Sequence, residues 1–420
     1  MYQKVKGTLD FYDDSAIKYR YVEEAITKVI KKYGYNEIIT PIFENTDLFV
    51  RSSGDESDIV TKEMYTFLDK GKRSITLRPE GTASVVRSFL ENKMYVNSNL
   101  TKLYYFGPMF RYERPQTGRY RQFTQFGVEA FGSSSPLLDA DVIISAYQIF
   151  KSLGINNLVL KINTIGDLES RTAYVNILKE YFKKDIKSLC SDCNNRLEKN
   201  PLRILDCKVD SESPIIKNAP KITDSLTNEA KEYFKKVLKT LDYNNIKYLV
   251  DENLVRGLDY YTDTVFEFII ESDDNLNGLA ICGGGKYSDM VKSFRGPDIP
   301  GIGYAFGIER VISIMEEKNL FPELDRIADI VLIALDDEAK LHSLKLANTL
   351  RANGYFAEID YINTTMKQQF KLSDKLNAKF IIIIGEDELK SESLTIKNSK
   401  TKLQETIKET DLLEYLKENL

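Results

Sequence analysis

The chain has 420 residues, of which 42% are hydrophobic and 29% are charged, and its formal net charge is −5. This length exceeds what one hydrophobic core usually organises, so we expect two or three domains. The acidic balance excludes binding to nucleic acid through overall charge, and any such contact needs local clusters of Lys and Arg.

Cysteine content and hydropathy indicate where the protein works. Four cysteines are too few for a disulfide framework and indicate a reducing, cytoplasmic environment. The N-terminal residues contain no long apolar segment, so no signal peptide is expected. The longest apolar runs, such as 380–384, have the length of a strand and are too short for a membrane span.

The chain opens with a predicted helix and a short strand. Ser15 can cap a helix that runs to about Tyr33, where Gly34 ends it. Residues 34–45 then indicate a strand interrupted by Pro41, which cannot donate to a ladder. An ordinary edge strand and a dimer interface both agree with this pattern.

A predicted hairpin follows, with strands at 64–67 and 74–77. It leads through Arg-Pro-Glu-Gly-Thr, residues 78–82, into a helix. Polar groups at such a turn can point into a cleft. Alternatively, Glu80 can be a first-turn carboxylate that the helix dipole favours. The residues alone favour the second interpretation.

Residues 103–132 are predicted to form two strands joined by a long basic loop. In the outgoing strand Arg111 and Glu113 are two residues apart, so the pleat directs both to one face. By the same period one face of the return strand carries Gln125, Gly127, Glu129 and Phe131, and the loop carries Arg114, Arg119 and Arg121. Such a face suits a pocket for an anionic, multi-phosphate substrate beside a small polar one.

A helical module is predicted from about 167 to 244, after a helix at 139–153 and a strand at 158–163. It contains Cys190 and Cys193 at a C-x2-C spacing, with Cys207 further on, which is a partial zinc pattern. A fourth Cys or His is missing nearby, because the remaining cysteine is Cys282 and the single histidine is His342. We therefore predict ordinary reduced cysteines and no metal site.

Strands return from about residue 248, and a separate domain begins near 326. Arg256 stands beside Tyr260 and Tyr261 in a partly extended setting. From residue 328 onward strands alternate with helices, which predicts a small α/β unit with parallel pairing. One of its helices carries a lysine every four residues, at 367, 371, 375 and 379. A solvated face is the usual explanation, and an RNA-backbone contact is the alternative.

Five sequence blocks, in order along the chain, resemble one family. Residues 34–49, 104–132 and 301–311 (GYNEIITPIFENTDLF, YYFGPMFRYERPQTGRYRQFTQFGVEAFG and GIGYAFGIERV) resemble motifs 1, 2 and 3 of class II aminoacyl-tRNA synthetases. Residues 254–267 and 280–290 (LVRGLDYYTDTVFE and AICGGGKYSDM) resemble the two histidine-specific signatures of the histidyl-tRNA synthetases. The resemblance covers nearly the whole chain.

This resemblance implies an α+β fold with two domains. Residues 1–325 would form a class II catalytic domain on an antiparallel sheet, with the helical insertion at about 167–244. Residues 326–420 would form an α/β anticodon-binding domain. The implied enzyme is a cytoplasmic homodimer that uses ATP, with Mg²⁺ as the substrate metal, to activate L-histidine and transfer it to the 3′ end of tRNA(His).

The resemblance also implies roles for individual residues. Arg111 and Arg256 would be catalytic, because fixed positive charge offsets the repulsion between a carboxylate and the α-phosphate. The implied ATP-binding residues are Arg111, Glu113, Arg121, Phe123 and Arg310. The implied histidine-binding residues are Glu80, Gly81, Thr82, Arg111, Gln125, Glu129, Arg256, Tyr260, Tyr261 and Tyr287. Lys367 and Lys371 would contact tRNA.

Two other functions and one mechanistic question stay open at this point. A non-catalytic, histidine-sensing regulatory subunit of ATP phosphoribosyltransferase shares this ancestry but typically lacks the terminal domain and parts of the ATP site. A tRNA-independent ligase on the same fold would not need the terminal domain. Because the proposed pocket contains no histidine, the transfer step must use Glu80, a substrate phosphate oxygen or no protein base.

Overall fold

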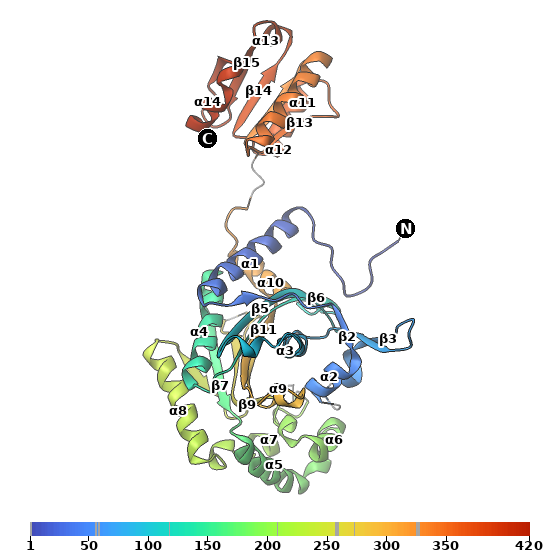
Figure 1. The fold of residues 1–420 in the computed structure, drawn as a ribbon, viewed down its shortest axis with the longest axis vertical. Coiled ribbons are helices and arrows are strands. Elements are labelled where there is room, and N and C mark those ends of the chain that lie inside the picture. Colours follow the sequence, from blue (N-terminus) through green and yellow to red (C-terminus); the bar gives the residue numbers. More distant parts are fainter. Residues whose placement is uncertain are drawn as a thin grey trace. The chain divides into compact units, whose positions relative to one another are not determined.

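The computed structural model describes residues 2–54, 57, 59–116, 118–207, 209–256, 260–272, 274–324 and 328–420. Two compact units are present, Met1–Phe321 and Pro322–Leu420 (Figure 1). The predicted domain boundary between residues 325 and 326 lies outside the described residues. None of the helices in the described ranges has the run of apolar residues that a bilayer-spanning segment needs.

An eight-stranded sheet is the centre of the first unit. Its order is β1-β5-β6-β11-β10-β9-β7-β8, and it is antiparallel except at its two ends, where β1 is parallel to β5 and β7 is parallel to β8. The strands are β1 (Asn36–Glu37), β5 (Thr101–Phe110), β6 (Gln122–Phe131), β7 (Leu158–Thr164), β8 (Tyr248–Val250), β9 (Thr262–Ile270), β10 (Ala280–Tyr287) and β11 (Gly301–Gly307). The predicted antiparallel sheet is confirmed.

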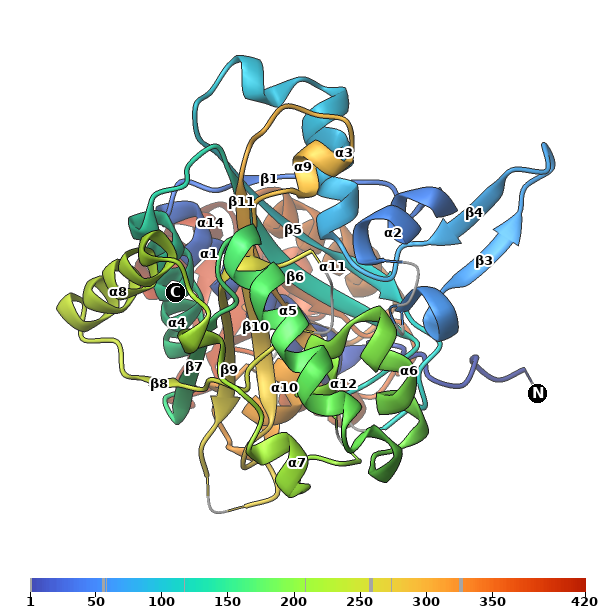
Figure 2. The same ribbon diagram turned by 90° about the horizontal axis from the view of Figure 1, so that it is seen from below.

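One face of this sheet is covered by four helices. They are α1 (Asp13–Lys32), α4 (Pro136–Ser152), α8 (Asn228–Tyr243) and α10 (Ile308–Glu317), of which α4 and α8 pack side by side (Figures 1 and 2). The even-numbered residues of β6, Phe126, Val128 and Ala130, point into this core. The predicted cap at Ser15 is wrong by three residues, because Tyr12 is the cap and the Ser15 hydroxyl bonds back to it.

The other face carries less cover, and this is where the polar face of β6 lies. Three helices pack there, α2 (Thr46–Ser53), α3 (Thr82–Glu91) and α9 (Met290–Ser293). They form a second core with odd-numbered sheet residues such as Leu103, Tyr105 and Phe131. A three-stranded sheet adjoins them, ordered β2 (Phe43–Asn45), β4 (Ser74–Leu77) and β3 (Tyr65–Leu68), which confirms the predicted hairpin.

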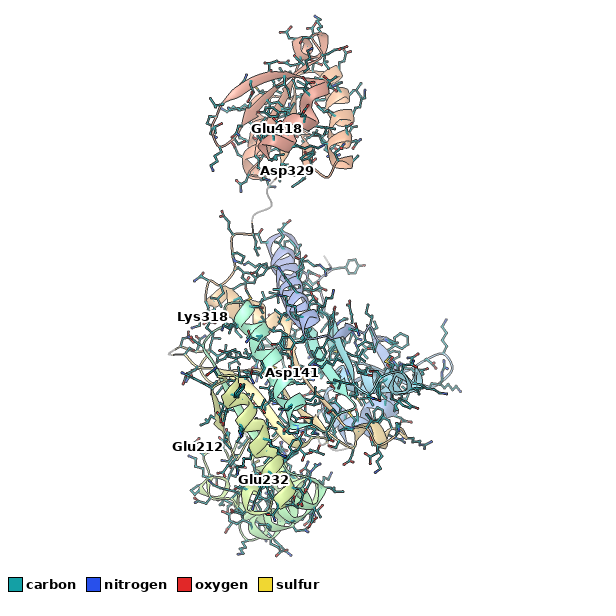
Figure 3. All side chains as sticks on the ribbon, turned by 60° about the vertical axis from the view of Figure 1, so that its left-hand side comes forward. Asp141, Glu212, Glu232, Lys318, Asp329 and Glu418 are labelled. Atoms are coloured by element: carbon teal, nitrogen blue, oxygen red, sulfur yellow. The ribbon has the colours of Figure 1, made fainter. Side chains whose placement is uncertain are left out.

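The insertion between β7 and β8 is helical, as predicted. It contains α5 (Leu168–Lys183), α6 (Ser191–Lys199) and α7 (Pro214–Lys217) before α8, and Glu212 and Glu232 mark its surface in Figure 3. Its own apolar core includes Leu254, Val255 and Tyr261, which follow β8. Three 3₁₀ turns also lie in the insertion, at Ile186–Ser188, Pro201–Ile204 and Ile222–Asp224. Elsewhere in the described residues there are a π turn at Ile59–Glu63 and 3₁₀ turns at Met94–Val96 and Glu409–Asp411.

The second unit is a five-stranded sheet with helices, ordered β13-β12-β14-β15-β16. Its elements are β12 (Ile330–Ala334), α11 (Asp337–Ala352), β13 (Ala357–Ile359), α12 (Met366–Lys375), β14 (Phe380–Ile384), α13 (Glu386–Lys390), β15 (Ser393–Asn398), β16 (Gln404–Lys408) and α14 (Leu412–Asn419). β12 pairs in parallel with β13 and β14, as predicted, whereas β15 and β16 add an antiparallel edge. His342, on α11, has its Nε2 2.7 Å from Glu409 Oε2.

Candidate active site

A polar cavity of about 340 Å³ opens on the less covered face of the large sheet. Its wall comes from the turn before α3, the loop between β5 and β6, the segment after β8, and the start of α10. Strands β5, β6, β9, β10 and β11 also contribute to it. Four arginines and three glutamates line it: Arg111, Arg119, Arg256, Arg310, Glu80, Glu113 and Glu267. A cavity with this excess of guanidinium groups suits a ligand that carries several negative charges.

Arg111 and Glu113 lie in the cavity wall, but the prediction that they belong to a strand is wrong. The β5–β6 ladder ends at the pair of Phe110 and Gln122, and the chain then turns, with Glu113 N–H donating to Arg111 O. Arg111 Nε donates to Pro79 O at 2.8 Å, and its guanidinium carbon lies 5.4 Å from the centre of the Phe123 ring. A loop therefore holds these two side chains, and the hydrogen bond to Pro79 fixes Arg111.

Basic groups surround Glu113 at this end of the cavity. Arg111 Nη1 lies 3.9 Å and Arg119 Nη1 3.5 Å from its carboxylate oxygens. Arg310, from the start of α10, donates from Nη1 to Ala280 O at 2.6 Å. The carboxylate is thus outnumbered by arginines, so net positive charge is left for an anionic ligand.

Arg256 occupies a slot that the sheet provides. Glu267 of β9 and Gly283 of β10 are neighbours in the ladder, and Arg256 Nη1 forms an ion pair with Glu267 across them. A Cβ on Gly283 would lie 2.1 Å from Arg256 Nη2, so only glycine leaves room for the guanidinium. Arg256 Nε is buried and finds no hydrogen-bond acceptor among the described residues.

Glu80 closes the opposite end of the cavity and caps α3. Its two carboxylate oxygens accept hydrogen bonds from Thr82 N at 2.7 Å and Ala83 N at 2.9 Å. Burial, which leaves 3% of the residue exposed, raises the pKa of Glu80 above its usual range. The interpretation of Glu80 as a first-turn carboxylate is wrong in position, because the residue lies two positions before Thr82, where α3 begins. Its carboxyl nevertheless accepts from N–H groups of that first turn and also lines the cavity.

Glu129 lies directly behind this wall. It is 1% exposed, accepts a hydrogen bond from Thr82 Oγ1 at 2.7 Å and accepts another from the Tyr287 hydroxyl. Burial raises the pKa of Glu129 to about 8, because a charged carboxylate is poorly solvated there. A cation that came close to Glu129 would favour its ionised form.

Gln125 connects the two walls through its amide oxygen. Gly81 N and Tyr105 Oη both donate to Gln125 Oε1, each at 3.2 Å. Because a backbone N–H can only donate, this contact fixes which way the amide faces. Tyr105 is 4% exposed and fills the space above Gly127, so it holds Gln125 in place.

Ten of the fourteen residues predicted for this site line the cavity. They are Glu80, Thr82, Arg111, Glu113, Phe123, Gln125, Arg256, Tyr260, Tyr261 and Arg310. Gly81, Glu129 and Tyr287 are one layer behind it. Arg121 is outside the lining, since its guanidinium packs 4.0 Å from the centre of the Tyr112 ring. The predicted roles of all fourteen stay predictions.

Sequence reasoning missed Tyr105 and Glu267, both of which line the cavity. The available signal for Glu267 was a lone carboxylate within the apolar strand residues VFEFII. Tyr105 gave no such signal, since an aromatic residue in a strand is ordinarily part of the core.

Comparisons with known proteins agree along the whole chain. The family model for histidyl-tRNA synthetase matches residues 7–311, and that for the anticodon binding domain matches residues 329–419. The histidine–tRNA ligases of Staphylococcus haemolyticus and of Staphylococcus aureus are 47% and 48% identical, over 98% of this chain and 98% and 99% of theirs.

Solved structures give the same result. The apo histidyl-tRNA synthetase of S. aureus aligns with 99% of this chain and all of its own length, with a TM-score of 0.86 and 43% identity. An ATP phosphoribosyltransferase regulatory subunit/histidyl-tRNA synthetase from Bacillus halodurans aligns at 20% identity and a TM-score of 0.66, over 92% of this chain and 98% of its own, and so shares the fold. With sequence, fold and cavity in agreement, the chain belongs to the histidyl-tRNA synthetase family.

Proposed function

We propose that this cavity is where the chain, a histidine–tRNA ligase, joins L-histidine to ATP to give histidyl-adenylate and pyrophosphate. The histidyl group then moves to the 3′ end of tRNA(His). The enzyme class follows from family membership. The observation that carries the assignment to this cavity is that Arg111 and Arg256, from segments far apart in the chain, line it together.

The two arginines would offset the electrostatic repulsion that opposes the first step. The histidine carboxylate must attack the α-phosphorus, which brings two anions together and adds charge to the phosphoryl oxygens. Guanidinium groups that are already in place stabilise that charge without reorganising during the reaction. We propose that Arg111 and Arg256 bind the α-phosphate from two different sides.

The end of the cavity near Arg310 is the proposed ATP subsite. Phe123 offers a ring face for adenine, and Glu113 offers an acceptor for its amino group. Arg310 would hold the outer phosphates. Arg121 is a second candidate for that role, and it would have to leave the Tyr112 ring to reach them. Mg²⁺ would enter with ATP as the substrate metal.

The end near Glu80 is the proposed histidine subsite. Glu80, Thr82 and Gln125, with Gly81 behind them, would receive the α-ammonium group. Tyr260 and Tyr261 line the adjoining wall. The Glu129–Tyr287 pair lies behind Thr82 in this subsite. We assign this pair, together with Tyr261, to the two imidazole nitrogens of the substrate. A site that pairs both nitrogens rejects apolar isosteres strongly.

The terminal unit favours tRNA charging over the two other functions. Residues 329–419 match the anticodon binding domain, which the regulatory subunit typically lacks and a tRNA-independent ligase does not need. The full-length relatives at 47% and 48% identity are histidine–tRNA ligases. The regulatory-subunit alternative is therefore not supported.

The assembly and location belong to the same proposal. We infer a homodimer, because the segment around Pro41 leaves Ile39 84% and Phe43 54% exposed, and Leu68 of β3 is 68% exposed. We place the enzyme in the cytoplasm, where its tRNA substrate is found. A mass equal to one chain in light scattering at micromolar concentration would contradict the dimer.

The test of this function is histidine-dependent exchange of pyrophosphate into ATP by the purified full chain. We expect exchange with L-histidine and none above background with the other amino acids, because each would leave polar groups of the subsite without partners. Absence of exchange with histidine would overturn the activation step. Exchange without aminoacylation of tRNA(His) would overturn the transfer step alone.

The lysine stripe on α12 gives a separate prediction about tRNA, although the fourth predicted member, Lys379, lies beyond the end of the helix at Lys375 and pairs with Asp329. Lys367 and Lys371 are exposed on this helix, which lies in the second unit. Reversing both charges with Lys367→Glu and Lys371→Glu should weaken tRNA charging about tenfold or more, since each lost phosphate contact weakens binding, and should leave exchange near normal. The KM for tRNA in aminoacylation measures this effect.

A matched double reversal at Lys400 and Lys402, in the exposed turn between β15 and β16, is the control. It changes the charge of the same unit by the same amount. Equal losses in the two double variants would show a general charge effect rather than a contact by α12. An equal fall in exchange would show damage to the enzyme as a whole.

A further inference from the structure

The helical insertion brings three of the four cysteines of the chain together with Asp210. The four ligand atoms of this cluster, one each from Cys190, Cys193, Cys207 and Asp210, all lie within 4.8 Å of one another. Cys193 is fully buried and Cys207 is 3% exposed, whereas Cys190 and Asp210 are half-buried. The fourth cysteine, Cys282, lies in the sheet and outside this cluster.

Two of the distances in the cluster match those of a tetrahedral zinc site, and all of its ligand atoms lie within 4.8 Å of one another. With Zn–S of about 2.3 Å and Zn–O of about 2.1 Å, two sulfurs of a tetrahedron are about 3.8 Å apart, and a sulfur and an oxygen about 3.6 Å. The separation from Cys190 Sγ to Cys207 Sγ is 3.6 Å, and that from Cys207 Sγ to Asp210 Oδ2 is 3.5 Å. These three side chains are therefore spaced to share one ion, and the remaining separations, which are at most 4.8 Å, exceed a tetrahedral edge by no more than about 1 Å.

The spacing of these residues follows the pattern of a two-pair zinc site. Cys190 and Cys193 form a C-x2-C pair at the start of α6, and Cys207 and Asp210 form a C-x2-D pair in the turns that follow. Asp210 thus takes the place of the second cysteine of the second pair. A carboxylate oxygen is an ordinary zinc ligand, so the missing Cys or His no longer counts against a metal.

Backbone groups hold the ligand atoms in this arrangement. Asp210 N donates to Cys207 Sγ at 3.4 Å, and Cys190 N donates to Asp210 Oδ2 at 2.9 Å. Hydrogen bonds of this kind orient the ligands of a metal and spread the charge of thiolates. The first bond lies within the second pair, and the bond from Cys190 N to Asp210 Oδ2 joins the two pairs, which are separated in sequence by the rest of α6 and a 3₁₀ turn.

We propose that Cys190, Cys193, Cys207 and Asp210 bind one zinc ion that fixes the fold of the insertion around these four residues. Three thiolates select a soft or borderline metal, and four protein ligands leave no position open for substrate, so the role is structural. In the described residues between α6 and α8 the chain has only short helices and turns. An ion that ties the start of α6 to residues 207 and 210 of this irregular stretch supplies order that regular secondary structure does not.

The first experiment measures metal in the purified, untagged full chain. We expect about one zinc per chain by mass spectrometry of the metal after exhaustive dialysis, as for a structural site with four ligands. Replacement by Co²⁺ in the same protein should give thiolate-to-cobalt charge-transfer bands and intense visible bands of tetrahedral cobalt. These measurements do not depend on catalysis, so a negative result would contradict the zinc site without contradicting the proposed ligase activity.

Matched variants locate the ion. Cys193→Ser should lose zinc, whereas Cys282→Ser, which removes the one thiol outside the cluster, should keep it. Asp210→Asn should weaken zinc retention against a chelator at least tenfold, because a carboxylate ligand is lost, and Asp192→Asn, an exposed acid inside the C-x2-C pair, should not.

Three results would overturn the proposal. The first is a wild-type chain that contains no zinc and takes up no Co²⁺ while its thiols are reduced. The second is a disulfide between Cys190 and Cys207 in protein purified without oxidant. The third is zinc that stays in Cys193→Ser and Asp210→Asn alike. If Cys193→Ser does not fold, the cobalt spectrum of the wild type and the two aspartate variants still decide the outcome.

Discussion

Replacing Arg256 by alanine is expected to lower the rate of histidine-dependent ATP–pyrophosphate exchange by about 10³-fold or more, with the fold intact. The change removes a preplaced positive charge from the α-phosphate, and losing one such donor typically costs 10²- to 10³-fold in rate. It also leaves the Glu267 carboxylate unpaired in the cavity, which repels the phosphates further. Steady-state exchange kinetics with saturating histidine and ATP measure the effect, and circular dichroism checks the fold.

Two companion variants separate charge from geometry at this position. Arg256→Lys keeps one positive charge but loses the planar fork, so it should recover only part of the rate. Glu267→Gln removes the ion-pair partner while leaving the guanidinium in place, and it should lose less than Arg256→Ala. An Arg256→Ala enzyme whose rate constant stayed within about tenfold of the wild type would remove Arg256 from the mechanism.

Replacing Gly283 by alanine is expected to cause a comparable loss of exchange without removing any functional group. The new Cβ would lie 2.1 Å from Arg256 Nη2 and 2.4 Å from its Cζ, so the guanidinium must leave the slot. Because the clashing atoms are the end of a flexible side chain, the protein can relieve the clash cheaply, and thermal stability should change little. Exchange kinetics and a melting curve on the same preparation measure both effects.

The double variant Gly283→Ala, Arg256→Ala tests the stated cause. If alanine at 283 acts only by displacing Arg256, then adding it to Arg256→Ala should cost nothing further. Multiplicative losses would show that Gly283 contributes in another way, for example by letting a ligand approach the strand backbone. A Gly283→Ala enzyme with normal exchange would show that Arg256 does not need its slot.

Alternation along the strands allowed much of this site to be predicted. Gln125, Glu129 and Phe131 do share the less covered face of the sheet, because the period of a strand is independent of its surroundings. The turn before α3 was predicted as well, since Glu80 has the residue type that a helix start favours. The family resemblance then supplied residues such as Arg256, whose neighbours in the sequence gave little indication of a role.

What could not be predicted depends on contacts between distant segments. The sequence does not show where the β5–β6 ladder ends, so Arg111 and Glu113 were assigned to a strand that stops at Phe110. Glu267 belongs to the site because it forms an ion pair with Arg256, which comes from a different segment of the chain. Asp210 becomes a candidate metal ligand only because the fold brings its carboxylate next to Cys190. A sequence pattern that requires a fourth Cys or His does not include a carboxylate.

The parallel pairing of β7 and β8 has a consequence for shortened forms of this enzyme. A tight hairpin cannot connect two parallel neighbours, and the connecting chain must cross over with about a dozen residues or more. The helical insertion is that crossover, since it leaves from β7 and returns at β8, six residues before Arg256. Excising it to obtain a minimal catalytic core would therefore cut the path that brings Arg256 to the phosphate, and any replacement must span the same edge of the sheet.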